Sequence, residues 1–156
     1  MRRRVQRVRA AGLRIALASL ALGAGCRGLR PGGAAQREVP PEQVVRDYLV
    51  AYNRHDVPAV LALLDPTVAW LSIEGDSVRV EARGLDAMRR GLEAYFRNTL
   101  DARSVAETMT SLGPWVTVRE RAYWRSGRTR RSQAAMSVYE VRNGRIRRVW
   151  YYPVVR

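Results

Sequence analysis

Apolar residues recur every three or four positions in three segments of the chain, and each such stripe predicts a helix. The segments cover residues 41–53, 57–64 and about 85–100. Asp56 is a good N-cap for the second helix, and Asp65-Pro66 is expected to end it. The stripes consist of Val44, Val45, Tyr48, Leu49 and Tyr52 in the first, Val57, Val60, Leu61 and Leu64 in the second, and Leu85, Met88, Leu92 and Phe96 in the third.

The rest of the chain alternates between apolar and polar residues, which is typical of β-strands. Strands are predicted over residues 67–73, 77–81, 104–111, 116–124, 131–141 and 145–152. Asn143-Gly144 predicts a tight hairpin, because both residues accept positive φ. Helices that precede a meander of strands favour an α+β fold, with the helices packed on one side of a curved antiparallel sheet.

The net charge of +14 is concentrated at the two ends of the chain. Residues 1–38 contain nine Arg and one Glu, whereas residues 119–156 contain eleven Arg and two acids. The C-terminal excess is compatible with a nucleic acid or an anionic membrane surface, but a solvated strand face explains it more simply. Nucleic acid is not expected as a partner, because no zinc-finger spacing or aromatic RNA-binding motif accompanies the arginines.

The N-terminus has the layout of an export signal, with an Arg-rich start followed by an apolar run over residues 15–25. The run is too short to cross a bilayer as a helix. Gly23-Ala24-Gly25-Cys26 resembles the processing site of bacterial lipoproteins, which implies that Cys26 becomes a lipidated N-terminus anchored in a membrane. Ordinary secretion, for example into the periplasm, and an uncleaved N-terminal anchor are the alternatives. The expected location is therefore the cell envelope.

Three regions are expected: a signal peptide over residues 1–25, a tether over residues 26–40 and a folded domain over residues 41–156. The tether is rich in Gly, Pro, Ala and Gln and lacks apolar periodicity, as flexible linkers do. Pro40-Pro41 separates it from the first predicted helix.

Several segments of the domain resemble the nuclear transport factor 2-like superfamily and its SnoaL-like branch. Residues 44–56 match the first helix of that family and its Asn-x-x-Asp exit, and residues 65–68 resemble the entry to its first strand. Residues 84–88 resemble the start of its third helix, and residues 143–152 its closing hairpin. The resemblance implies a cone, in which a curved sheet wraps about three helices and leaves a pocket at the open end.

Members of this superfamily range from isomerases, cyclases and hydrolases to non-enzymatic binders, so the resemblance does not assign an activity. Ketosteroid isomerase combines a helix Tyr, a buried acid and an Asp base. Tyr48 matches the Tyr, but the base position falls on Trp70 and the buried-acid position on Ser137. That activity is rejected, because proton abstraction from carbon at this position needs a carboxylate.

Glu120 is the most informative acid, because strand alternation places it on the same apolar face as Val118 and Ala122. A carboxylate there serves as a general base, accepts a hydrogen bond from a ligand, or pairs structurally with Arg131 or Arg147 on a neighbouring strand. The three interpretations remain open at this point.

The aromatic residues either line a ligand pocket with a few polar tips or simply fill the core. If they line a pocket, Ser137 is a further polar contact. His55 is expected at a helix C-terminus rather than in a catalytic role. The candidate binding residues are Tyr48, Tyr52, Trp70, Glu120, Trp124, Ser137, Tyr139 and Tyr151.

Three functions are compatible with these patterns. The leading hypothesis is a membrane-anchored domain that binds a small hydrophobic molecule, and the second is a lyase, isomerase or hydrolase that uses Glu120 with Tyr48. The third is an interaction module that dimerises through an outward sheet face with Ile146, Arg148, Trp150 and Tyr152. No cofactor or metal is expected, because His and Cys occur once each and the acids are scattered.

Overall fold

A computed structural model describes residues 39–152 of the chain. The predicted signal peptide, Cys26 and the tether up to residue 38 lie outside the described residues. Among the described residues, no helix has the length and apolar character needed to span a membrane.

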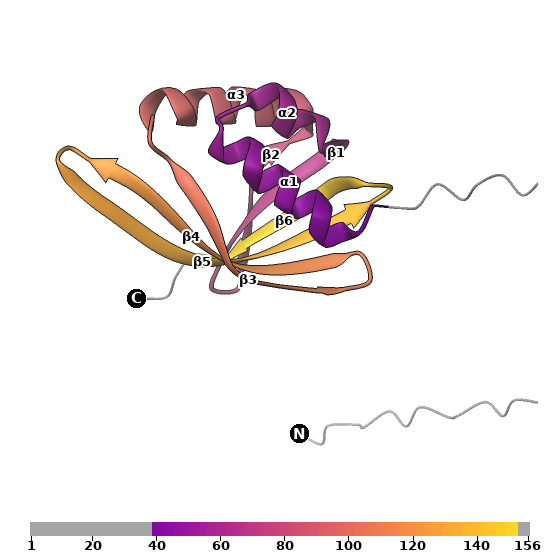
Figure 1. Cartoon of the computed structure of the whole chain (residues 1–156). Coiled ribbons are helices and arrows are strands. Elements are labelled where there is room, and N and C mark those ends of the chain that lie inside the picture. Colours follow the sequence, from indigo (N-terminus) through magenta and orange to yellow (C-terminus); the bar gives the residue numbers. More distant parts are fainter. Residues whose placement is uncertain (1–38, 153–156) are drawn as a thin grey trace, which may run out of the picture. The chain divides into compact units, whose positions relative to one another are not determined.

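Three helices form where the apolar stripes predict them. Helix α1 spans Pro41–Asn53, with its first turn started by Pro41, and α3 spans Gly84–Asn98. Helix α2 covers Val57–Ala62, and its N-cap Asp56 accepts a hydrogen bond from the Ala59 backbone N–H at 3.0 Å. All three helices lie on one face of the sheet (Figure 1).

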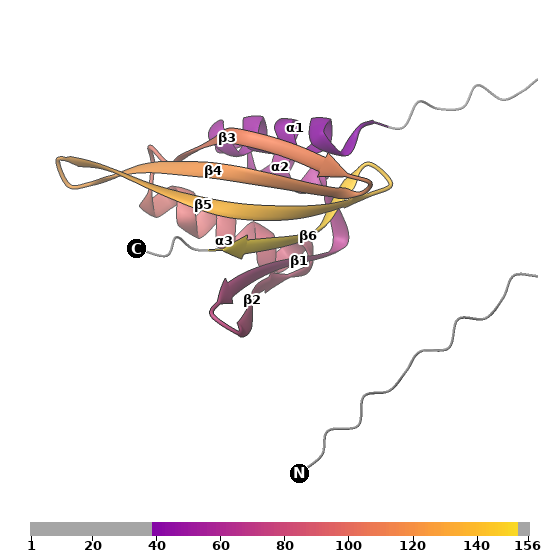
Figure 2. The same ribbon diagram turned by 90° about the horizontal axis from the view of Figure 1, so that it is seen from below.

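Six strands make a single curved sheet in the order β2-β1-β6-β5-β4-β3 (Figure 2). Three β-bulges increase the local twist and bend the sheet around the helices. Asn143 and Gly144 both have positive φ in the β5–β6 turn, which confirms the predicted hairpin. The strands are β1 Leu64–Glu74, β2 Ser77–Arg83, β3 Arg103–Leu112, β4 Trp115–Ser126, β5 Thr129–Arg142 and β6 Arg145–Tyr152.

The predicted α+β architecture with a curved sheet is confirmed, but the sheet is not wholly antiparallel. Strands β1 and β6 run parallel, because α3 carries the chain to the far edge of the sheet before the meander returns to β1. Asp65-Pro66 was expected to lie between helix and strand, yet it belongs to β1. Leu64 already pairs with Ile146 of β6, so the strand begins earlier than the sequence pattern predicts.

The sheet has an inner face, which contacts the helices, and an outer face. The hydrophobic core lies between the inner face and the helices, and it includes Tyr48, Val118, Tyr139 and Val149. Ile146 was predicted on the outward face, and that prediction is wrong because Ile146 is fully buried in the core. The bulge at Arg147 explains the error, since one extra residue reverses the alternation between Ile146 and Val149.

Candidate functional site

Glu120 lies near the middle of β4, with its side chain on the inner face of the sheet. Its neighbours Val116 and Val118 on the same face are fully buried, and Glu120 itself is only 8% exposed. The alternation of β4 therefore places the carboxylate as the sequence predicts, among apolar side chains rather than in solvent.

Two hydroxyl groups hydrogen-bond to this carboxylate. The Ser104 hydroxyl donates to Oε2 at 2.8 Å, and the Tyr139 hydroxyl donates to Oε1 at 2.5 Å. The expected alternative of a structural ion pair with Arg131 or Arg147 is wrong, because no ion pair joins Glu120 to any residue from 39 to 152. Arg131 pairs opposite Trp124, further along β4, and Arg147 is the exposed residue of the β6 bulge.

Tyr48 and Tyr139 form the floor of the site. The centres of their rings are 5.9 Å apart, and both side chains are almost completely buried. Burial, followed by the negative charge of Glu120, raises the pKa of both phenols, so both keep the proton that a hydrogen-bond donor needs. Within the described part of the chain, the Tyr48 hydroxyl has no hydrogen-bond partner.

These side chains enclose a cavity of about 210 Å³ between helices α1 and α3 and the inner face of the sheet, here called the inner pocket. Six of the eight candidate residues line it, whereas Trp124 and Ser137 do not. The lining residues are Tyr48, Leu49, Tyr52, Trp70, Tyr95, Ser104, Glu120, Ala122, Tyr139 and Tyr151.

The two candidates outside the inner pocket have different positions. Ser137 is fully buried on β5, and its hydroxyl finds no partner among residues 39–152. Trp124 lines a second hollow of about 300 Å³, which shares Tyr95, Ala122 and Tyr151 with the inner pocket. We call this second hollow the mouth, because it lies beside the inner pocket and shares these three lining residues with it.

Sequence reasoning missed three residues of the inner pocket that matter chemically. Tyr95 lies on α3 outside the predicted buried stripe. The one local hint of its role is that the next residue, Phe96, is a buried aromatic residue of that stripe. Ser104 starts β3, where nothing in the sequence indicates that it will reach Glu120 across the strand pair. Ala122 matters because its small side chain leaves space beside the carboxylate.

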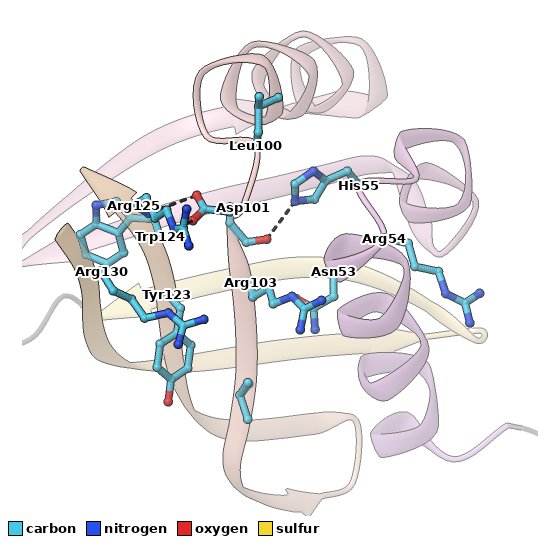
Figure 3. A pocket seen from close by; sticks show the side chains of 12 residues that line it. Asn53, Arg54, His55, Leu100, Asp101, Arg103, Tyr123, Trp124, Arg125 and Arg130 are labelled. Carbon is cyan, nitrogen blue, oxygen red and sulfur yellow. Dashed lines mark hydrogen bonds and ion pairs between the residues drawn. The ribbon is translucent and has the colours of Figure 1, made fainter. Parts of the chain in front are cut away.

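A wider hollow of about 650 Å³ opens beside the start of β3, and we call it the arginine hollow (Figure 3). Arg54, Arg103, Arg125 and Arg130 line it together with Asp101, which forms an ion pair with Arg125 at 3.5 Å. Leu100 at its rim is 81% exposed. The hollow is therefore wide, positively charged and open to solvent.

His55 lines the arginine hollow but has a structural role there. It lies just past Arg54, the C-cap of α1, with a positive φ, and its Nε2 hydrogen-bonds to the Ala102 carbonyl oxygen at 2.9 Å. Its ring stacks on Phe96 with 4.2 Å between the ring centres. The predicted position at the end of a helix is confirmed.

The sequence of the chain matches a family model over residues 45–149, and that model describes the SnoaL-like domain. The match covers most of the chain and all six strands lie largely within it. The chain belongs to the SnoaL-like family. No curated protein sequence matches this SnoaL-like chain.

Solved structures with the same fold include three informative ones. A cystatin-fold protein from Novosphingobium aromaticivorans is 18% identical, with a TM-score of 0.64 over 76% of this chain and 99% of the other. An LEH-like epoxide hydrolase from M. tuberculosis is 20% identical, with a TM-score of 0.63 over 73% and 82% of the two chains. A ketosteroid isomerase-like protein from Catenulispora acidiphila in complex with trimethylamine is 10% identical, with a TM-score of 0.62 over 72% and 86%.

These identities establish the fold of the SnoaL-like domain and nothing finer. The candidate chemistry lies in the inner pocket, where the buried Glu120 carboxylate borders a small space lined by aromatic rings. Residues 39–152 contain no cluster of three or more His, Cys, Asp or Glu side chains that would hold a metal ion.

Proposed function

We propose that the SnoaL-like domain binds a small organic molecule in the inner pocket. The observation that supports this proposal is a cavity of about 210 Å³ that is lined mostly by aromatic rings and contains a buried carboxylate without a counter-ion among the described residues. Ligand sites commonly combine an apolar lining with a few well-placed polar groups. In this pocket, Glu120, Ser104 and Tyr48 supply those polar groups.

Each part of the pocket has a defined task in binding. The centre of the Tyr48 ring lies 6.4 Å from that of Tyr52 and 6.5 Å from that of Trp70, and the three rings offer apolar contact area. The Tyr48 hydroxyl is buried and has no partner among residues 39–152, and a ligand that brings an acceptor within its reach removes the cost of this unpaired donor. The Catenulispora relative in complex with trimethylamine is consistent with a small ligand in this fold.

Saturation-transfer NMR of the full-length chain with a library of small organic fragments tests the proposal. Ala122 lines both the inner pocket and the mouth, so Ala122→Leu fills the space and is expected to abolish the fragment signals. Ala134→Leu makes the same change on the outer face, opposite Arg121, and is expected to leave them unaltered. Signals that survive in Ala122→Leu, or that disappear with substitutions in the arginine hollow, would contradict the proposal.

Catalysis by Glu120 with Tyr48 is a second candidate function. It is favoured by two residues that line the same pocket, since the Tyr48 hydroxyl has no partner among residues 39–152 and would stabilise a negatively charged oxygen while Glu120 accepts a proton. Such a lyase, isomerase or hydrolase activity requires the Glu120 carboxylate itself. Unchanged turnover of a bound substrate in the Glu120→Gln variant would exclude it.

The outer face supports a third candidate, a homodimer formed through the sheet. Trp115 and Trp150 lie against each other with ring centres 5.4 Å apart, and Met136 and Tyr152 beside them are exposed. An exposed apolar patch of this kind favours association. Analytical ultracentrifugation is expected to show a dimer that Trp150→Arg disrupts, whereas a monomer at high concentration would contradict it.

The N-terminal sequence supports anchoring of the domain in the cell envelope through a lipid on Cys26. If the anchor exists, the wild-type chain partitions into detergent and Cys26→Ser partitions into the aqueous phase. A wild-type chain whose mass shows no added lipid at Cys26 would exclude lipidation and leave secretion or an uncleaved anchor as the alternatives.

A further inference from the structure

The inner pocket has the opposite charge to the rest of the chain. The chain has a net charge of +14, yet Glu120 is the one formally charged side chain among the described residues that line the pocket. The residues of the mouth, which include Thr99, Trp124 and Gln133, are also uncharged. The residues that line the pocket and the mouth therefore carry one negative charge and no positive one.

The hydrogen bonds to Glu120 leave its charge uncompensated. Ser104 and Tyr139 satisfy both carboxylate oxygens, but their hydroxyl groups are neutral. A buried carboxylate without a cation is costly, because the protein interior solvates the charge far less well than water does. The charge is compensated if the ligand supplies the cation.

The rings around Glu120 also favour a positive charge. Tyr48, Tyr52, Trp70, Tyr139 and Tyr151 all line the pocket, and the ring of Tyr95 lies 6.4 Å from that of Tyr52. The face of an aromatic ring attracts a cation within about 6 Å of its centre, and an alkylated ammonium is the cation that such ring clusters bind best. An anionic ligand would be repelled by the Glu120 carboxylate, and the lining offers no cation to bind it.

We infer that the occupant of the inner pocket is a small organic cation, whose ammonium group lies between Glu120 and the ring cluster. The inference rests on the proposed ligand-binding function and names the chemical class of the ligand. The cavity of about 210 Å³ accommodates on the order of seven non-hydrogen atoms, at about 30 Å³ for each water-sized group. Longer substituents extend through the mouth, past Trp124.

Calorimetric titration of the full-length chain with two probes of the same shape tests the inference. Choline and 3,3-dimethylbutan-1-ol differ in that a quaternary nitrogen in choline is replaced by a carbon in the alcohol. Choline is expected to bind at least about tenfold more tightly, because a desolvated cation gains from both the rings and the carboxylate.

Glu120→Gln removes the charge but keeps the size of the side chain, and it is expected to reduce or abolish the preference for choline. Glu74→Gln is the matched control, because Glu74 lies at the β1–β2 turn in an exposed ion pair with Arg79. Tyr95→Leu is a second test that spares the core, since Tyr95 is 40% exposed. It is expected to weaken choline several-fold and to affect the alcohol less.

The outcomes separate this inference from the proposed function. If both probes bind equally and Ala122→Leu abolishes both, the pocket binds small molecules but the cation inference is wrong. If neither probe binds while uncharged fragments do, the inference is also wrong and the proposed function stands. If no fragment of any charge depends on Ala122, both are wrong.

Discussion

The inner pocket and the arginine hollow are two concave regions of one domain, and they differ in volume, in charge and in the burial of their polar groups. The arginine hollow is the larger, at about 650 Å³ against about 210 Å³, but its charges face solvent and Asp101 already pairs with Arg125. The inner pocket is smaller, and its carboxylate and phenols lie among buried rings.

In this domain, the volume of a hollow is a poor guide to whether it is a candidate site. A charge in solvent interacts weakly with any ligand, because water screens it. The same charge among apolar side chains interacts strongly, and so does an unpaired hydroxyl group. Burial of polar groups therefore favours the inner pocket as the candidate site, although it is the smaller of the two hollows.

The largest expected difference between the two regions concerns stability. Tyr48→Ala removes a buried ring from the floor of the pocket and is expected to lower the free energy of unfolding by about 3–5 kcal/mol. Arg130→Ala, in the arginine hollow, is expected to change it by less than about 0.5 kcal/mol. Urea denaturation followed by circular dichroism measures both, and similar losses would remove the contrast.

Alkaline pH is expected to act through the pocket. Burial, followed by the charge of Glu120, raises the pKa of Tyr48 and Tyr139 above the ordinary value of 10.0. Above about pH 10 the unfolded chain therefore loses protons that the folded chain retains, so stability falls as pH rises, by up to about 1.4 kcal/mol per pH unit for each group.

The measurement is absorbance at 295 nm together with circular dichroism between pH 9 and pH 12. The two buried phenols are expected to ionise in the same step in which the fold is lost, and Arg130→Ala is expected to follow the same curve. Complete ionisation of every tyrosine while the circular dichroism signal persists would show that the pocket is open to water.

Tyr139→Phe changes the inner pocket by a single atom, because it removes the hydroxyl oxygen whose hydrogen is donated to Oε1 of Glu120. The carboxylate then loses one buried hydrogen bond, and the free energy of unfolding is expected to fall by about 1–3 kcal/mol. Tyr123→Phe makes the same change in the arginine hollow, where Tyr123 is partly exposed, and is expected to have little effect. Thermal unfolding compares the two, and equal shifts would argue against a special role for the bond.

The smallest expected effect concerns the ion pair of the arginine hollow. Arg125→Ala breaks its contact with Asp101, and because both side chains are largely exposed, the loss is expected to stay below about 1 kcal/mol. High salt is expected to abolish the difference between variant and wild type. A larger loss that persists in high salt would mean that the hollow is better shielded from water than its exposure indicates.

Much of the fold could be predicted from the sequence, because local patterns determine it. The apolar stripe of α1 gave the observed bounds, and Asn143-Gly144 gave the hairpin. The parallel pairing of β1 with β6 could not be predicted, since it depends on where α3 delivers the chain. The buried position of Ile146 was missed for a related reason, because a bulge is invisible to a strict two-residue period.

The candidate site could be predicted only in part. Alternation along β4 was enough to place Glu120 on the inner face, and the helix stripe was enough for Tyr48. The hydrogen bond from Ser104 depends on the register of β3 against β4, which the sequence does not encode locally. The arginines expected near Glu120 lie elsewhere for the same reason.

The pairing of β1 with β6 also determines when the domain can fold. Strand β1 is made early, but it lies inside the sheet between β2 and β6, the last of the described strands. Until Arg145–Tyr152 leave the ribosome, the nascent β1–β2 hairpin has no neighbour on its other edge. Such a high contact order favours slow folding after synthesis, and a chain that ends before β6 is expected to expose β1 and aggregate.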